Sequence, residues 1–269
     1  MTYIRLDLLD LALPALLLVL NGALSVALRL GLERQLAAAA LRMVVQLMLV
    51  GYVLAALFAL ASPVWTAGAA LAMVVFAGRE IAARQGRPIA KGRSLALGTG
   101  CALTAAGSVT ALALLTQLRP EPWYDPRYAL PLLGMVLGNT MTGIALGLDA
   151  LTTGAVRDRA AVEARLALGA TRHEALLPVA RAALRTGLMP TVNGMAAAGV
   201  VSLPGMMTGQ ILAGVEPTEA VKYQLSVMFL IAGGTGLGTV AAVFGGVHLL
   251  TDERHRLRLD RVGARGGGA

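Results

Sequence analysis

Seven long apolar stretches follow one another along the chain, separated by short and mostly polar connections. A membrane core about 30 Å thick is crossed by roughly 20 residues of α-helix, and each stretch reaches that length. The stretches cover residues 8–28, 37–60, 64–83, 95–115, 128–148, 188–215 and 223–250. The pattern predicts an all-α, polytopic helical bundle of about seven transmembrane helices over residues 1–250, followed by a basic, Gly-rich cytosolic tail at 251–269.

Lys and Arg residues are distributed very unevenly over the connections. Alternate connections lie on the same side of a membrane, and one such set, with the C-terminal segment, contains 18 of the 23 basic residues. The other set contains four, and Arg42 lies inside a span. Because basic residues collect in cytoplasmic loops, we expect the N-terminus outside and the C-terminus in the cytosol. This topology, with contacts to anionic lipid, accounts for the net charge of +8 and argues against nucleic-acid binding.

The composition supports a membrane protein. Apolar residues make up 57% of the chain and charged residues 14%, and the mean hydropathy is +0.70. These values exclude an ordinary soluble domain, in which about 25% of residues are charged. The single cysteine, Cys101, lies in the fourth span and is interpreted as a small buried apolar residue. Trp123, Tyr124 and Tyr128, in and beside a proline-rich connection, are typical of aromatic residues at headgroup level.

The connection at residues 150–187 is the only long one on the predicted cytosolic side. Apolar residues four apart, such as Val162 and Leu166, predict an amphipathic helix, and the same spacing after Gly169 predicts a second one. Thr171 and Glu174 match the capping box that begins a helix. The break at Gly169 favours a docking element. A helix that lies passively on the inner leaflet remains the alternative.

Two spans carry polar or irregular positions that are unusual at membrane depth. In the sixth span, Pro204 removes a helical hydrogen bond and Gly205 loosens the next turn, so we expect a kink or break there. A broken helix at this depth either lines a pathway or is a structural kink whose backbone is satisfied by neighbours. The pathway candidates are Asn139 and Thr142 in the fifth span and Asn193, Ser202, Pro204, Gly205, Met206, Met207, Thr208 and Gln210 in the sixth.

Asn139 and Thr142 share one helical face, which we expect to point at a neighbouring helix or a cavity rather than at lipid. The same span contains two pairs of glycines spaced by four residues, Gly134 with Gly138 and Gly143 with Gly147. Such pairs let helix backbones approach closely in lipid. Packing within one chain and contact with a second copy both remain open.

The chemistry of an enzyme is missing from the sequence. Neither of the two lysines, Lys91 and Lys222, belongs to a phosphate-binding Gly-x4-Gly-Lys-Ser/Thr loop, so the chain is not expected to hydrolyse ATP. The three histidines have no spacing typical of a metal site. Asp10 and Arg42 are the two charges deepest in apolar sequence and are candidates for a functional role, or for helix-end residues that reach water.

Several motifs resemble known permeases. Glu163-Ala-Arg with Gly169 resembles the start of the EAA loop of ABC-transporter permeases, in which a short coupling helix docks on the ATPase subunit. A wider similarity to the FetB/YbbM permease family is carried by the motif Val201-Ser-Leu-Pro-Gly-Met-Met-Thr-Gly209 and by residues 166–171, 188–192, 211–214 and 220–224. Residues 134–139 and 141–143 also match it, so the resemblance extends over about residues 130–250.

The resemblance implies an inner-membrane permease that pairs with a separate ABC ATPase subunit, is assigned to iron export and has plant relatives linked to aluminium tolerance. We expect the chain to form a homodimer in a bacterial inner membrane. ATP and Mg would bind to the ATPase subunit, and this chain would hold no cofactor of its own. No metal ligands follow from the resemblance. The ATPase-coupling residues it implies are Glu163, Leu166, Gly169, Ala170 and Thr171.

Three other functions remain open at this point. One is an ABC permease for a non-metal substrate. Another is a self-sufficient secondary transporter or channel, which would need more ionisable residues in its spans than Asp10 and Arg42. The third is a membrane anchor or assembly factor without transport, which would not need a broken, polar sixth span.

Overall fold

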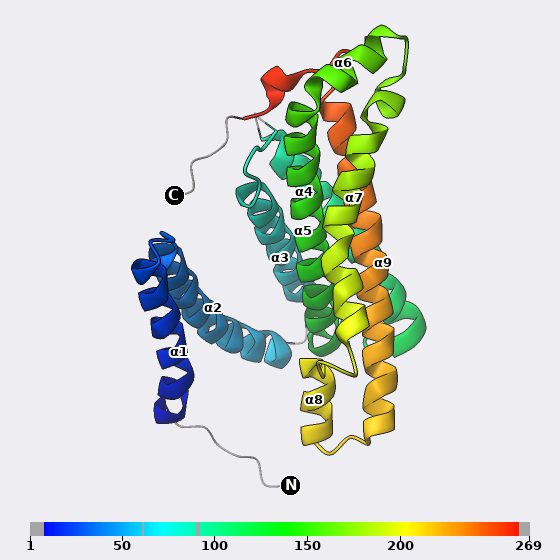
Figure 1. Ribbon diagram of the computed structural model, residues 1–269. Coiled ribbons are helices and arrows are strands. Elements are labelled where there is room, and N and C mark those ends of the chain that lie inside the picture. The colour runs from blue at the N-terminus through cyan, green and yellow to red at the C-terminus, as the bar shows by residue number, and fades with distance from the viewer. Residues whose placement is uncertain (1–7, 61, 90–91, 264–269) are drawn as a thin grey trace. The chain divides into compact units, whose positions relative to one another are not determined.

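The computed structural model describes residues 8–60, 62–89 and 92–263, and the chain forms two compact units, Met1–Leu60 and Ala61–Ala269 (Figure 1). In the first unit, α1 (Leu8–Ala27) and α2 (Glu33–Leu60) pack together as a helical hairpin. The buried hydroxyl of Ser25 fixes their connection, because it donates to Glu33 Oε2 at 3.1 Å and accepts from the Leu32 N–H at 3.0 Å. Most other side chains of the hairpin are exposed, including nearly all the leucines and valines.

The second unit is a bundle of long helices with α5 (Pro126–Arg157) at its centre. Four helices pack directly on α5 (Figure 1). They are α3 (Pro63–Ala83), α4 (Arg93–Ala113, continued by the π-helical turn Leu114–Leu118), α7 (Arg172–Ala197) and α9 (Pro217–Leu249). Two shorter helices, α6 (Arg159–Ala167) and α8 (Gly205–Leu212), and a 3-10 turn at Leu259–Arg261 complete the unit.

The structure confirms the predicted all-α, polytopic membrane fold. The described residues contain no strand, only isolated bridges. Within the same residues, six helices are long and apolar enough to cross a membrane, namely α1, α2, α3, α4 with its π-helical turn, α5 and α9. The predicted sixth span is not among them because its helix is interrupted. The number of crossings and the orientation stay predictions.

The cytosolic connection is organised differently from the prediction. The second amphipathic helix is not separate from the sixth span, since α7 begins at Arg172 and continues without interruption to Ala197. Likewise, α5 extends nine residues beyond the predicted end of the fifth span, to Arg157. Both helices continue because their buried faces do: Leu151 and Ala155 of α5 and Leu176 and Val179 of α7 belong to one apolar cluster. The charged residues between them lie on the exposed faces.

Glycines set the contact between α5, α7 and α9. A Cβ atom on Gly187 would lie 2.6 Å from the carbonyl oxygen of Gly143, and one on Gly143 would lie 2.6 Å from Thr239 Oγ1. Gly147 has similarly close neighbours on α9, whereas nothing lies within 4 Å of the corresponding position on Gly138. The Gly143 and Gly147 pair therefore serves packing within one chain. We call this contact the glycine seam.

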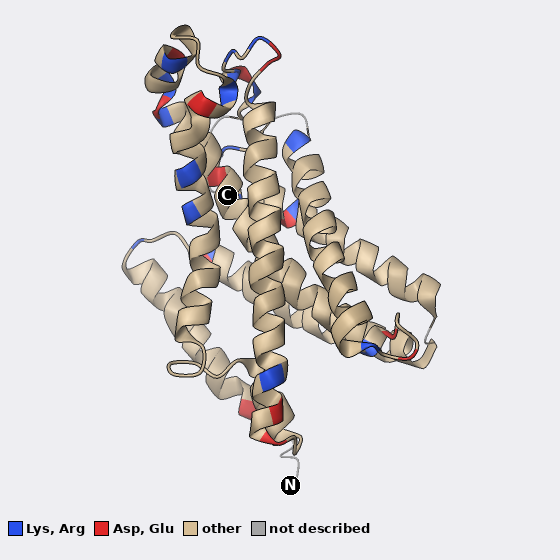
Figure 2. Cartoon of the chain, turned by 90° about the vertical axis from the view of Figure 1, so that its right-hand side faces the viewer, with Lys and Arg blue, Asp and Glu red and all other residues tan. Residues whose placement is uncertain are grey.

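Three Arg-rich segments of the second unit meet at one end of the bundle. The Gly86 N–H donates to Asp149 Oδ1 at 2.8 Å, Ile89 pairs with Val262, and the Arg172 N–H donates to His255 Nδ1 at 3.3 Å. Figure 2 shows the Lys and Arg residues gathered mainly at this end, around α6 and the C-terminal segment. These alternate connections therefore share one side, as the charge pattern predicts. We call this side the Arg-rich end.

Candidate coupling and translocation sites

The first candidate site is the turn between α6 and α7 at the Arg-rich end. The Gly169 N–H donates to the Leu166 carbonyl at 3.0 Å and the Ala170 N–H to the Arg165 carbonyl at 3.1 Å, which together form a Schellman motif. Gly169 has a φ of +91°, a conformation that suits glycine. Nothing lies within 4 Å of where its Cβ would be. The glycine is thus required by the backbone conformation and not by a close neighbour.

The predicted capping box begins α7. The Thr171 N–H and hydroxyl both donate to Glu174 Oε2 at 2.8 Å, and the Glu174 N–H donates to Thr171 Oγ1 at 3.4 Å. These hydrogen bonds, from the Thr171 backbone first and its hydroxyl second, hold the pKa of the Glu174 carboxyl below its ordinary value. A Schellman motif and a capping box therefore fix the two helix ends on either side of a four-residue turn.

Buried apolar contacts and one arginine fasten α6 to the body of the bundle. Val162 is fully buried, and Leu166 and Ala170 pack on the same cluster. Arg165 Nη1 donates to the Ala175 carbonyl at 3.2 Å and so ties α6 to α7. Glu163 instead faces solvent and pairs with Arg159 of its own helix at 2.8 Å. We call residues 159–174 the coupling element.

The coupling element ends in an apolar tip that the sequence motifs did not single out. The Leu168 side chain is 88% exposed, directly before Gly169 in an Arg-rich environment. A partner that covers an exposed leucine removes its apolar surface from water, and this stabilises the complex. The signal was present in the sequence, because Leu168 lies outside the four-residue spacing of the buried Val162 and the partly buried Leu166.

The segment after α9 folds onto the Arg-rich end. Asp252 organises it by accepting from the N–H groups of Arg254 and Arg256 at 3.0 and 2.9 Å and from Arg256 Nε at 2.8 Å. Arg261 Nη1 donates to the Leu249 carbonyl at 2.9 Å, and His255 Nδ1 accepts from the N–H and the Nε of Arg172, each at 3.3 Å. Residues 251–263 thus link α9, the 84–93 connection and the start of α7.

We expect Asp252→Asn to loosen this segment. The hydrogen bonds, chiefly from the Arg256 backbone, lower the pKa of Asp252. The ionised carboxylate therefore stabilises the segment fully above roughly pH 4, and this stabilisation is lost as the pH falls through the lowered pKa. Hydrogen exchange of residues 251–263 at pH 7 should be faster in the variant, by about tenfold or less. Asp260→Asn is the control, since Asp260 pairs with Arg258 at the surface. Equal exchange in Asp252→Asn and the unchanged chain would contradict this role.

The second candidate site consists of polar residues on α5 and α7. Asn139 is exposed and its Nδ2 donates to the Met135 carbonyl at 2.9 Å, while the half-buried Thr142 donates to the Gly138 carbonyl at 3.0 Å. Asn193 is exposed on α7. The Asn139 and Thr142 side chains bond to carbonyls of their own helix, so the expectation that they point at a neighbouring helix or a cavity rather than at lipid stays a prediction.

The predicted break in the sixth span is confirmed, but it begins earlier than Pro204. Helix α7 ends at Ala197, Gly199 has a φ of +87°, and its N–H donates to the Ser202 carbonyl at 2.9 Å. Pro204 then precedes α8 in an extended conformation. Val200, exposed by 91%, and the exposed Ser202 lie in this non-helical segment. Because Gly199 already turns the chain, Pro204 fixes the start of α8 rather than the end of α7.

The remaining candidates of the sixth span lie on α8. Met206 packs against the core of the bundle, which favours its structural interpretation. Thr208 Oγ1 donates to the Pro204 carbonyl at 3.2 Å and so stabilises the first turn of α8. Gly205 is exposed, and Met207 is half-buried. Gln210 Oε1 is buried and has no hydrogen-bond partner among the described residues.

Sequence reasoning missed three buried threonines along the glycine seam. The hydroxyls of Thr140 on α5 and of Thr235 and Thr239 on α9 are buried without a hydrogen-bond partner in the described part of the chain. Their signal was the pattern Gly234-Thr-Gly-Leu-Gly238-Thr, in which small residues recur every four positions. Polar groups of this kind at a tight helix contact are costly unless they bond to something.

No acidic or cysteine-rich metal centre accompanies these polar groups. Over residues 8–60, 62–89 and 92–263, no three His, Cys, Asp or Glu side chains lie close enough to hold a metal ion. The rings of His173 and His248 come within 5.4 Å of each other at the Arg-rich end, although they are far apart in sequence.

Comparison with known proteins assigns the chain to a family. A family profile described as "Uncharacterised protein family (UPF0014)" matches residues 8–250. The chain belongs to the UPF0014 family. The match includes both units and ends just before the C-terminal segment that Asp252 organises.

Three known proteins are similar to the chain over most of its length. A UPF0014 membrane protein of Synechocystis is 38% identical over 212 residues, 79% of this chain and 81% of the relative. A probable iron export permease protein, FetB, of Escherichia coli is 31% identical over 248 residues, 92% and 93% of the two chains. The Arabidopsis thaliana protein ALUMINUM SENSITIVE 3 is 33% identical over 231 residues, 86% and 82%. No solved structure matches the chain.

Proposed function

We propose that the chain is the permease subunit of an ABC transporter in a bacterial inner membrane, driven by a separate ATPase subunit and exporting iron or a related metal ion. The observation that carries this proposal is the coupling element, a rigid turn at the Arg-rich end with an exposed apolar tip at Leu168. The substrate part rests on the E. coli relative, whose name is that of a probable iron export permease.

Helix α7 gives the coupling element a direct mechanical connection to the break. It extends from Arg172, next to the docking turn, to Ala197, where the non-helical segment begins. At 1.5 Å per residue its 26 residues extend over about 39 Å. A displacement of the turn by the ATPase subunit would therefore reach the Gly199 end through one continuous helix.

The polar face of α5 and α7 supports a homodimer with the pathway between the copies. Asn139, Thr142 and Asn193 lie on neighbouring helices that meet at Gly143 and Gly187, and exposed amides are unfavourable against lipid tails. A second copy, or water between two copies, would cover them. Gly138, open beside Asn139, leaves room for close approach of another helix.

An ABC permease for a non-metal substrate is the main alternative, since hydroxyls and amides along the candidate pathway fit small polar molecules equally well. A self-sufficient transporter is less well supported because the described spans offer few ionisable groups for coupling.

The N-out, C-in orientation belongs to the same proposal. A reporter fused after residue 263 that is active only outside the cytosol would overturn that orientation.

We expect Leu168→Asp to weaken docking of the ATPase subunit by about tenfold or more. Burying a leucine stabilises a contact by roughly 1.5–3 kcal/mol, and an aspartate in its place would also need to be desolvated. Because Leu168 is exposed in the isolated chain, folding and insertion should be unaffected. The measurement is recovery of the ATPase subunit with the tagged chain at matched membrane levels. Leu168→Met, which keeps an apolar tip, is the control; equal recovery from both variants would contradict the docking role.

A further inference from the structure

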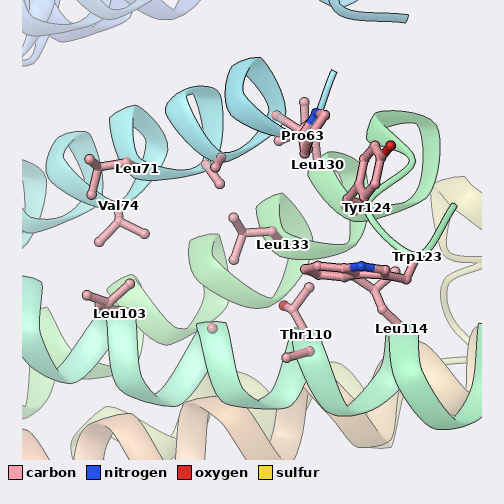
Figure 3. Close-up of a pocket in the computed structure, with 16 residues that line it drawn as sticks. Pro63, Leu71, Val74, Leu103, Thr110, Leu114, Trp123, Tyr124, Leu130 and Leu133 are labelled. Carbon is pink, nitrogen blue, oxygen red and sulfur yellow. The ribbon is translucent and has the colours of Figure 1, made fainter. Parts of the chain in front are cut away.

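A cavity of about 510 Å³ opens between the ends of α3, α4 and α5 that lie opposite the Arg-rich end (Figure 3). Pro63 at the start of α3, Leu114 after α4 and Leu133 on α5 form parts of its wall. Trp123 and Tyr124, from the connection between α4 and α5, lie at its mouth with their rings edge to face at 5.9 Å. The volume falls within the range of about 300–1,000 Å³ of small-molecule sites.

The wall of this cavity is mostly apolar, and one of its buried polar groups lacks a partner among the described residues. Thr110 is 5% exposed, and its hydroxyl has no hydrogen-bond partner among the described residues. Nearby threonines donate to the carbonyl one turn earlier, as Thr104 does to Gly100 at 2.9 Å and Thr66 to Ser62 at 2.9 Å. Thr110 instead extends from α4 into the cavity below the indole of Trp123 (Figure 3).

We propose that this cavity binds one acyl chain of a membrane phospholipid, with Thr110 Oγ1 donating to the ester carbonyl. The chain would extend from Thr110 along the apolar wall toward Val74 and Leu103, at the far end of the cavity (Figure 3). Trp123 and Tyr124 at the mouth suit the depth at which lipid headgroups and ester groups lie. The proposal concerns a lipid site and is independent of what the permease transports.

A phospholipid matches the cavity better than an apolar segment of protein does. The occupant must present one hydrogen-bond acceptor near Thr110 and a long apolar body beyond it. The residues that precede α3 in sequence, 55–60, are Ala, Leu and Phe only, so their side chains offer no acceptor. An ester-linked acyl chain has both parts.

The test is quenching of Trp123 fluorescence by phospholipid brominated in its acyl chains, added to the detergent-purified full chain. The background variant is Trp65→Phe, which leaves Trp123 as the only tryptophan and changes an exposed residue outside the cavity wall. Gly107→Leu fills the cavity: a Cβ on Gly107 would meet only Leu103 Cδ1, at 3.9 Å. Gly100→Leu is the matched control on the same helix, with nothing within 4 Å.

We expect saturable quenching at about one phospholipid per chain. The apparent affinity for the phospholipid should fall by tenfold or more in Gly107→Leu and stay unchanged in Gly100→Leu. Thr110→Val keeps the shape but removes the hydrogen bond, so its affinity should fall about three- to tenfold. Equal quenching in Gly107→Leu and Gly100→Leu would overturn the proposal. The absence of saturable quenching in the Trp65→Phe background variant would also overturn the proposal. This is the result expected if the first unit covers the cavity. Tighter binding of a brominated free fatty acid would overturn the assignment to phospholipid.

Discussion

Replacing Gly187 by alanine should lower the melting temperature of the protein by several degrees. The added Cβ would lie 2.6 Å from the Gly143 carbonyl oxygen and 2.7 Å from Thr239 Cγ2, so α7 would have to move away from both α5 and α9. Overpacking of this kind costs about 1–3 kcal/mol, which corresponds to roughly 2–10 °C for a domain of this size. The glycine seam holds the three helices that would transmit movement, so transport should fall as well.

Gly194→Ala provides the matched control for this change. Gly194 lies two turns further along α7, and nothing lies within 4 Å of its Cβ position. The better helix propensity of alanine, worth up to about 1 kcal/mol, should leave stability unchanged or slightly raise it. Thermal unfolding of both variants in detergent, followed by size-exclusion recovery, measures the difference. Melting temperatures that shift equally in the two variants would show that the seam is looser than described.

Replacing Gly169 by valine should lower recovery of the ATPase subunit by about tenfold or more, while the spans still insert. The φ of +91° is strained for any side chain and most strongly for a β-branched one, at a cost of order 1–3 kcal/mol. The turn would relax by changing the Schellman motif, and this would displace Leu168 from the tip. Transport that depends on the ATPase subunit should be lost in parallel.

Gly214 offers a control of the same geometry at the opposite end of the bundle. It has a φ of +94°, and the N–H groups of Gly214 and Val215 donate to the carbonyls of Ile211 and Gln210, which forms a second Schellman motif. Gly214→Val should therefore introduce the same strain without affecting ATPase recovery. If both variants lose the ATPase subunit, or if neither does, Gly169 has no specific role in docking.

The coupling turn could be predicted from the sequence because its signals are local. Thr171 and Glu174 are three residues apart and cap one another, and Gly169 marks the turn between two apolar patterns. The length of α7 could not be predicted in the same way. Arg181 and Arg185 lie on an exposed face while Ala180 and Ala183 continue the buried one, so α7 runs from the cytosolic connection into the sixth span.

Contacts between distant segments were beyond the sequence. Spaced glycines predict close approach but not the partner, so only the structure pairs Gly143 with Gly187 and leaves Gly138 open. The hydrogen bonds from Gly86 to Asp149 and from Arg172 to His255 join residues more than 60 positions apart, with no local signal. Thr110 is likewise an ordinary helical threonine until the structure shows its hydroxyl without a partner in the described residues.

The most direct test of the account is ATP-dependent transport of ferrous iron into inside-out membrane vesicles. Vesicles would contain the chain together with its ATPase subunit, the chain alone, or the complex with Gly169→Val in place of the unchanged chain. The account predicts iron uptake only with both subunits and ATP, and its loss in the Gly169→Val complex. Uptake by vesicles that contain the chain alone, or ATP hydrolysis by the purified chain without a partner, would contradict it.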